Sequence, residues 1–237
     1  MAKEIDIKAL YEAGVQFGHK TSRWHPKMAE YIHSKRQDSH IINLEKTVEA
    51  LKEALPAVGK IVAGGKKVLF VGTKKQIKDV IKTMAEAVGQ PYVTERWIGG
   101  TLTNTETINK QIKKLVSLEK RMASGELEKR YSKLEVQRYQ EEIDFLNTRY
   151  GGIKDLSGKP GAVVVFGAHD EKNAVKEAKK MHIPVFALVD TNADPTGIDF
   201  VIPANDDAIK SVQIIAEYFA DAVKEGIKKE GQDDKQD

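Results

Sequence analysis

Several carboxylates and one imidazole are the side chains of this sequence that could hold a metal ion. The oxygen-bearing residues follow two apolar runs, VFALV and DFVI, and they are Asp190, Asn192, Asp194, Asp206 and Asp207. The carboxyl ends of parallel strands meet at one edge of a sheet, so these oxygens are expected to lie close together. The candidate ligands for zinc or magnesium are His19, Asp190, Asp206 and Asp207. The alternative is that Asp190 and Asp206 cap loops and helices by accepting hydrogen bonds from backbone N–H groups.

Nucleophilic catalysis finds little support in the composition. The chain has no cysteine, which excludes disulfides, thiolate metal sites and a cysteine nucleophile, and suits a reducing compartment. The serine and histidine residues show no spacing that predicts a nucleophile, a base and an acid acting together.

The stretch VGTKKQ, 71–76, joins an apolar run to a helical pattern, as the phosphate-binding turns of many α/β enzymes do. A dinucleotide fingerprint needs three glycines here, and only Gly72 is present. The nearest match to a P-loop, Gly59 to Gly64, lies before the apolar run instead of after it. The lysines around this helix start therefore suit nucleic-acid phosphates, or form a solvated helix face; they are Lys74, Lys75, Lys78 and Lys82.

Two further segments, 17–28 and 95–104, mix basic and aromatic residues in the way that RNA-contacting loops do. The first is expected to be an irregular loop that carries Lys20, Arg23, Trp24, His25 and Lys27. In the second, Arg96 and Trp97 precede two glycines that could act as a hinge. The alternatives are a buried Trp24 with its charges pointing outward, and a Trp97 that anchors the core.

The charge distribution favours a polyanionic partner on one side of the molecule. The net charge is +3, with a pI near 8.8. Residues 1–100 contain 17 Lys and Arg against 11 Asp and Glu, a net +6, whereas residues 151–207 contain 6 against 9. The basic excess therefore lies in the N-terminal half, although a mildly basic solvated surface explains the same numbers.

Apolar runs and helical periodicity alternate along most of the chain. The expected strands are 68–71, 92–93, 162–166, 185–189 and 199–202. Three of the runs are continuously apolar, which is typical of parallel strands buried on both faces. Helical patterns at 44–62, 77–88, 174–181 and 209–219 lie between or after them, with Asp170 as the expected cap of the third and Asn205 or Asp206 as the cap of the fourth. The order predicts a doubly wound α/β sheet.

The region 103–150 interrupts this alternation. Apolar residues recur every three or four positions on both sides of Gly125, which predicts two helices with a coiled-coil seam. Thr103 with Glu106, and Ser132 with Glu135, have the spacing of capping boxes. We expect an antiparallel helical hairpin that projects on the order of 30 Å from the α/β domain.

The remaining segments complete a single domain, 1–237. Residues 28–43 are expected to form a β-hairpin with Lys35 and Arg36 at its tip, and 226–237 a disordered tail. The sequence contains neither a signal core nor an apolar run of membrane-spanning length, so we expect a cytoplasmic protein that does not bind membranes.

Several motifs, in this order, resemble one known family. They are GVQFGH (14–19), W-x-P-K-M (24–28), IINLEKT (41–47), FVGTKKQ (70–76), RWIGGTLTN (96–104), IPVFALVDTNADP (183–195) and IPANDDAI (202–209). Over residues 5–223 the chain resembles the second protein of the bacterial small ribosomal subunit. It departs from that family at Gly161 and Gly167, where the family often has aspartate, which weakens any acidic site there.

The resemblance implies a flavodoxin-like α/β domain with a coiled-coil insertion and a structural role without catalysis. It implies contacts with ribosomal RNA and with neighbouring proteins, including the large mRNA-binding protein built of OB-folds, and it implies no small-molecule substrate and no required cofactor. The candidate RNA-binding residues are Lys20, Arg23, Trp24, His25, Lys27, Lys35, Arg36, Lys74, Lys75, Lys78, Arg96, Trp97, Thr103, Asn104, Lys110, Lys113 and Lys114. The alternatives are an enzyme acting on sugar phosphates or nucleotides, and a free scaffold that works through its coiled coil.

Overall fold

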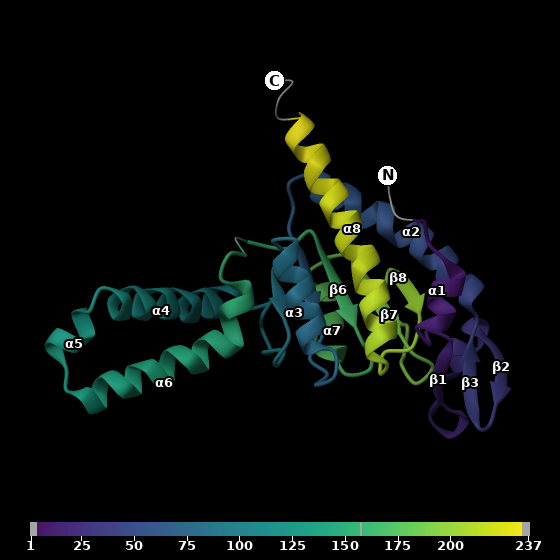
Figure 1. The fold of residues 1–237 in the computed structure, drawn as a ribbon, viewed down its shortest axis with the longest axis horizontal. Coiled ribbons are helices and arrows are strands. Elements are labelled where there is room, and N and C mark those ends of the chain that lie inside the picture. Colours follow the sequence, from purple (N-terminus) through teal and green to yellow (C-terminus); the bar gives the residue numbers. More distant parts are fainter. Residues whose placement is uncertain (1–3, 157, 234–237) are drawn as a thin grey trace.

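A five-stranded parallel sheet forms the centre of the molecule (Figure 1). The computed structural model describes residues 4–156 and 158–233. The strands are β4 (Val68–Val71), β5 (Tyr92–Val93), β6 (Ala162–Phe166), β7 (Val185–Val189) and β8 (Phe200–Pro203), in the order β5-β4-β6-β7-β8. Counted from β4, the order is 2-1-3-4-5, which is consistent with a flavodoxin-like fold. The predicted parallel sheet is therefore confirmed.

The sheet is buried on both faces, which explains its continuously apolar strands. Every residue of β4, β6 and β7 is buried. Val68 and Phe70 point into one apolar cluster and Leu69 and Val71 into another, because successive side chains of a strand alternate between faces. One strand therefore contributes to two cores.

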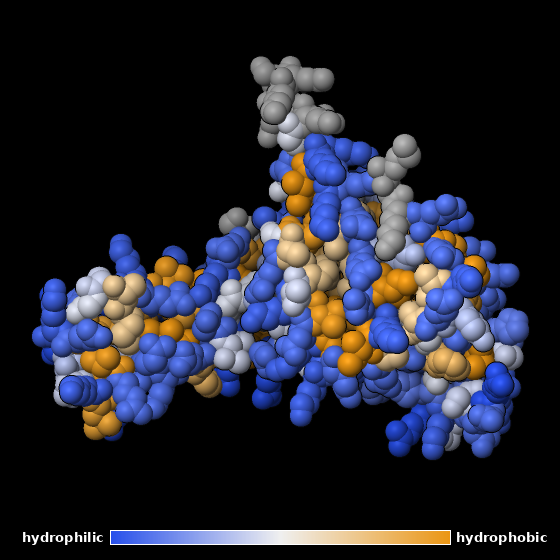
Figure 2. Space-filling view, in the orientation of Figure 1, coloured by the Kyte–Doolittle hydropathy of each residue, from blue (hydrophilic) through white to orange (hydrophobic). Residues whose placement is uncertain are grey.

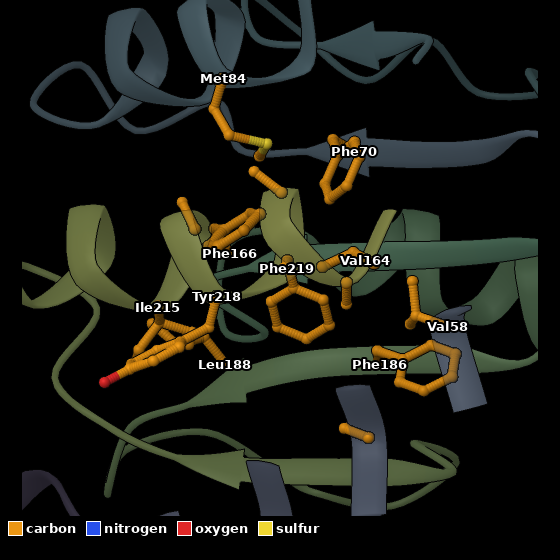
Figure 3. Close-up of a cluster of buried hydrophobic side chains, with 14 of the residues drawn as sticks. Val58, Phe70, Met84, Val164, Phe166, Phe186, Leu188, Ile215, Tyr218 and Phe219 are labelled. Carbon is orange, nitrogen blue, oxygen red and sulfur yellow. The ribbon is translucent and has the colours of Figure 1, made fainter. Parts of the chain in front are cut away.

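Helices cover both faces. The first face lies under α1 (Ile7–Glu12), α2 (Leu44–Ala63), α3 (Lys78–Ala87) and α8 (Ile209–Asp233), and the second under α7 (Lys172–Lys180). Figure 3 shows the first cluster, where the Phe219 ring of α8 lies near the rings of Phe166 from β6 and Phe186 from β7. Its ring centroid lies 6.3 Å from that of Phe166 and 6.4 Å from that of Phe186, both in edge-on contact.

The N-terminal region forms a second, three-stranded antiparallel sheet of order β1-β3-β2. Its elements are β1 (Phe17–Lys20), the 3-10 turns η1 (Thr21–Arg23) and η2 (Pro26–Tyr31), β2 (Ile32–Arg36) and β3 (Ser39–Ile42). The β2–β3 hairpin confirms the prediction for 28–43, and its turn residues Gln37 and Asp38 have φ of 47° and 62°, as a tight two-residue turn requires. The expectation of an irregular loop at 17–28 is wrong for 17–20, which pair with β3.

Two long helices project from the α/β body (Figure 1). They are α4 (Thr105–Ala123) and α6 (Lys133–Tyr150), joined at the far end by α5 (Glu126–Arg130), and η3 (Gly151–Ile153) follows. Buried residues of both helices, among them Leu115, Leu118 and Ile143, continue the cluster on the second face of the sheet. The two helices thus share their apolar seam with the body, while coiled-coil packing between them stays a prediction.

Some caps and one terminus differ from expectation. Asn104, not Thr103, caps α4 by accepting from the Thr107 N–H. Asp170 does not cap α7, whose N-terminal flanking residue is Glu171. The predicted disordered tail, 226–237, is helical through Asp233, and residues 234–237 lie outside the described residues. No helix in the described parts of the chain is both long and apolar enough to cross a membrane.

Candidate nucleic-acid interface

Lys74 lies at the centre of an acidic cluster at the carboxyl edge of the sheet. Its Nζ is 2.6 Å from Asp206 Oδ1, 3.0 Å from Asp207 Oδ1 and 3.4 Å from Asp170 Oδ2. The Lys74 side chain is only 13% exposed. The charge of Lys74 is therefore shared with carboxylates from two other loops, and its contact with an RNA phosphate stays a prediction.

The pKa values of this cluster follow from one lysine shared among several acids. Burial opposes the charge of Lys74, but Asp206 and Asp207 outweigh it and raise the lysine pKa above its ordinary value. The pKa of Asp206 is raised to about 6, first because of burial and then because of the neighbouring Asp190 carboxylate, while Lys74 acts in the opposite direction. The pKa of Asp206 is raised although Lys74 pairs with it, because the Asp206 carboxylate is buried beside Asp190.

His19 lies between two of the predicted metal ligands. Its Nδ1 is 3.1 Å from Asp190 Oδ1 and its Nε2 is 3.2 Å from Asp207 Oδ2. The hydrogen bond to Asp190 is the main cause of a raised pKa for His19. His19, Asp206 and Asp207 each offer a ligand atom within 4.8 Å of the others, and Asp206 Oδ2 has no hydrogen-bond partner among the described residues. The grouping is weak evidence for a metal site, because Lys74 already pairs with Asp206 and Asp207, and His19 pairs with Asp207.

Asp190 has the structural role that the sequence left open as the alternative. Its Oδ1 accepts the N–H and the hydroxyl of Thr191, and its Oδ2 accepts the N–H of Asp206 at 3.4 Å. Asp194 does not belong to this cluster. It accepts hydrogen bonds from the N–H and the hydroxyl of Thr196 and pairs with Lys27 at 3.5 Å. Hydrogen bonds from Thr196 lower the pKa of Asp194 to about 2. The acidic residues therefore form two groups.

Two unpaired cations line a hollow beside the Lys74 cluster. The hollow has a volume of about 650 Å³, and its lining includes Arg23 from η1, Lys75 and Gln76 after β4, and His169 and Asn192 after β6 and β7. His19, Lys74, Asp170 and Asp207 of the Lys74 cluster also line it. Arg23 and Lys75 are exposed, and no carboxylate of the described chain lies within 4 Å of either cation. A second hollow of about 420 Å³ places Lys20 beside Arg23. Segments 17–28 and 71–76 therefore meet at this edge of the sheet.

The other candidates in the first segment have internal contacts. Trp24 is 39% exposed, and its ring centroid lies 5.3 Å from that of His40. His25 Nε2 is 4.0 Å from Asp194 Oδ1. At the tip of the β2–β3 hairpin, Lys35 pairs with Asp38 at 3.6 Å, whereas no described carboxylate lies within that range of the exposed Arg36.

Segment 95–104 is held to α7 by one carboxylate. Glu177 accepts the Trp97 indole N–H at 3.0 Å, and the N–H groups of Gly100 at 2.8 Å and Leu102 at 3.0 Å. It also accepts the N–H and the hydroxyl of Thr103 at 3.2 and 3.1 Å. Trp97 is only 9% exposed, which favours the alternative that it anchors the core, and its stacking on an RNA base stays a prediction.

Glu177 was missed by sequence reasoning because nothing local distinguishes it from the other charged residues of its helix. Gly100 has a φ of 94°, which glycine adopts freely and which turns its N–H toward Glu177. Partial burial raises the pKa of Glu177, but the hydrogen bonds from Trp97, Gly100, Leu102 and Thr103 together lower it. Arg96, next to this anchor, is exposed without a carboxylate within 4 Å among the described residues.

The remaining lysines differ in their partners. Lys78 pairs with Glu95 at 2.9 Å and Lys110 with Glu106 at 2.7 Å, and Lys114 of α4 pairs with Glu142 of α6. Lys113 is exposed and has no such partner among the described residues. The unpaired, exposed candidates are thus Lys20, Arg23, Arg36, Lys75, Arg96 and Lys113.

Comparison with known proteins identifies the family. The family model for ribosomal protein S2 matches residues 10–226. The small ribosomal subunit protein uS2 of Roseiflexus castenholzii is 49% identical over 222 residues, which cover 94% of this chain and 84% of that protein. Its counterpart in Flavobacterium johnsoniae is 47% identical over 233 residues, covering 98% and 91%. The chain therefore belongs to the ribosomal protein S2 family, whose members are structural proteins of the small ribosomal subunit and not enzymes.

Proposed function

We propose that this protein binds ribosomal RNA through unpaired cations at the carboxyl edge of its parallel sheet. The observation that carries the proposal is the convergence of Lys20, Arg23 and Lys75, from two distant segments, around hollows where no described carboxylate neutralises them. Such cations neutralise phosphates and release counterions, so they supply affinity without reading base sequence. Arg36, Arg96 and Lys113 extend the contact toward the β-hairpin and α4.

Replacing the three edge cations together tests this proposal. The variant Lys20→Gln, Arg23→Gln, Lys75→Gln should compete poorly with the wild-type protein for small subunits that lack it. Its occupancy should fall by at least about tenfold, because three cations no longer neutralise phosphates. A tenfold loss corresponds to about 1.4 kcal/mol of binding free energy. Quantitative mass spectrometry of gradient-purified subunits measures the ratio.

A matched control removes the same charge at the opposite edge of the sheet. Lys66 and Lys159 precede β4 and β6, and Lys180 ends α7 before β7, and all three are exposed. Changing all three to Gln should leave occupancy near that of the wild type. Equal losses in the two triple variants would show that only net charge matters and would refute a specific edge.

We also infer that the protein helps to hold the OB-repeat mRNA-binding protein on the small subunit, because this anchoring is expected of the family to which the chain belongs. In this role the protein is cytoplasmic. Subunits assembled without this chain should lose that protein on gradient sedimentation and regain it when the chain is added back. Retention in its absence would contradict the anchoring role.

A divalent metal at His19, Asp206 and Asp207 is a second candidate, favoured by the unpartnered Asp206 Oδ2. Zinc or magnesium should then raise the melting temperature of the wild type but not of His19→Asn, because a ligand that binds the native state stabilises it. The same measurement with nucleotides and sugar phosphates tests the enzyme alternative, for which no shift is expected.

A further inference from the structure

The outward face of α6 carries an unusual set of exposed residues. Leu134, Arg138, Phe145 and Arg149 lie on one face, because their spacings of four, seven and four residues return to the same side of a helix. We call these four residues the α6 strip. Leu134 is 60% exposed and Phe145 is 52% exposed. At about 1.5 Å per residue the strip is about 22 Å long, and Figure 2 shows apolar residues among hydrophilic ones on the visible side of the projecting helices.

Arginine and aromatic side chains are already organised within the strip. The Arg149 guanidinium carbon lies 3.9 Å from the centroid of the Phe145 ring, a cation–π contact that holds both side chains in place. No carboxylate of the described chain lies within 4 Å of the charged groups of Arg138 or Arg149. Glu141, which lies between them, accepts a hydrogen bond from Gln137. The strip therefore combines two available cations with two apolar side chains.

A cleft at the base of α6 continues the strip. It has a volume of about 400 Å³, and Arg149 lines it together with Lys82, Glu86, Glu95 and Gly152. Gly152 permits the close approach that shapes its wall, since a Cβ there would lie 2.3 Å from the Tyr92 carbonyl oxygen. The cleft is thus built by the contact between the end of α6 and the edge strand β5.

The charges of this cleft suit a carboxylate. Glu95 pairs with Lys78 at 2.9 Å, whereas Glu86 accepts the Tyr92 hydroxyl at 2.6 Å and keeps its negative charge. Lys82 and Arg149 are exposed, and neither has a carboxylate within 4 Å in the described part of the chain. An incoming acidic side chain would therefore meet two cations, Lys82 and Arg149, and one described carboxylate without a cationic partner, Glu86.

We propose that the α6 strip and this cleft bind an amphipathic segment of a neighbouring protein that presents apolar and acidic side chains. Aromatic and arginine residues are enriched in protein interfaces, and an amphipathic helix can cover Leu134 and Phe145 while its carboxylates reach Arg138 and Arg149. An RNA backbone would satisfy the arginines but would leave Leu134 without an apolar partner. The inference rests on the proposed function, because the neighbour is a protein of the small subunit.

Site-specific photo-crosslinking in assembled subunits tests the inference. The full-length protein carries photoreactive p-benzoylphenylalanine in place of Leu134, or, as control, in place of Gln140, an exposed residue on a different face of α6. Position 134 should form a cross-link that protease removes and nuclease does not, and position 140 should not. A nuclease-sensitive cross-link at 134, or equal yields at both positions, would overturn the inference.

Substitutions within the strip provide an independent measurement. Phe145→Ser or Arg149→Gln should lower the protein cross-link from position 134 by about tenfold, as expected when one anchor of an interface is removed. Melting temperatures near that of the wild type would exclude misfolding, since both side chains are exposed. If these variants assemble normally and the cross-link from position 134 is unchanged, this inference alone is refuted. If the wild-type protein does not assemble into subunits, the proposed function is refuted as well.

Discussion

Glu177 illustrates how one side chain positions a segment that carries others. Its two oxygens accept five hydrogen bonds from four residues between 97 and 103, where the chain leaves β5 and enters α4. A carboxylate that accepts several backbone N–H groups is held in its charged form. This residue therefore ties the base of the projecting helices to α7.

Removing the charge of Glu177 should destabilise the protein. Glu177→Gln is expected to lower the free energy of unfolding by about 1–3 kcal/mol near neutral pH, because several donors lose a charged acceptor. The pKa of Glu177 is lowered in the folded state from 4.5, so its contribution is complete above that value and is lost as the pH falls through the folded pKa. Urea unfolding at neutral and acidic pH measures the difference between wild type and variant, which should shrink in acid.

Glu128→Gln is the matched control for this experiment. Glu128 is exposed on α5 and has no hydrogen-bond or ion-pair partner among the described residues. Its replacement should leave stability nearly unchanged at every pH. A loss equal to that of Glu177→Gln would show that the hydrogen bonds to segment 97–103 contribute nothing specific.

At the scale of elements, α4 and α6 depend on a narrow apolar seam. Leu115 is fully buried in it, while its neighbour Val116 is 48% exposed. Because the seam continues into the cluster under the sheet, the projecting helices and the body are stabilised by one connected set of contacts.

Truncating the seam should therefore affect the whole molecule. Leu115→Ala is expected to lower the free energy of unfolding by about 2–5 kcal/mol, the cost of a cavity at a buried leucine. Val116→Ala, one residue away, should cost far less because its side chain is already half in solvent. Thermal unfolding of the two variants separates these outcomes, and equal effects would contradict the arrangement of α4.

At the scale of the whole molecule, the net charge of +3 conceals how the charges are paired. Lys74, Lys78, Lys110 and Lys114 pair with carboxylates of this chain, whereas Lys20, Arg23 and Lys75 have no such partner among the described residues. Under the proposed function, we expect the cations without a carboxylate partner in the described chain to contribute most to counterion release from RNA.

This difference predicts the salt dependence of RNA binding. The slope of log affinity against log salt should fall by about 0.7–0.9 for each phosphate that the protein no longer neutralises. The variant Lys20→Gln, Arg23→Gln, Lys75→Gln should therefore bind ribosomal RNA fragments with a slope that is smaller by about two units or more. Filter binding over a salt series measures the slope, and an unchanged value would mean that these cations do not bind phosphate.

Much of the fold could be predicted from the sequence because its signals are local. The runs at 68–71, 162–166 and 185–189 are continuously apolar, and each is a buried parallel strand. The β1 strand was missed because its four residues, FGHK, alternate poorly and are stabilised by pairing with β3. The extension of α8 through Asp233 was missed because a polar composition does not by itself exclude a helix.

The sequence by itself determined the parallel strands, most of the helices and the family, because apolar periodicity and contiguous motifs are properties of neighbouring residues. Only the tertiary structure decided which charges are available. Lys74 and Lys75 are adjacent, yet Lys74 meets Asp206, 132 positions away, while Lys75 faces solvent. The indole N–H of Trp97 likewise donates a hydrogen bond to Glu177, 80 positions away. Pairing between charged and polar groups depends on distance in space, and charged residues are too abundant along this chain for their spacing to reveal it.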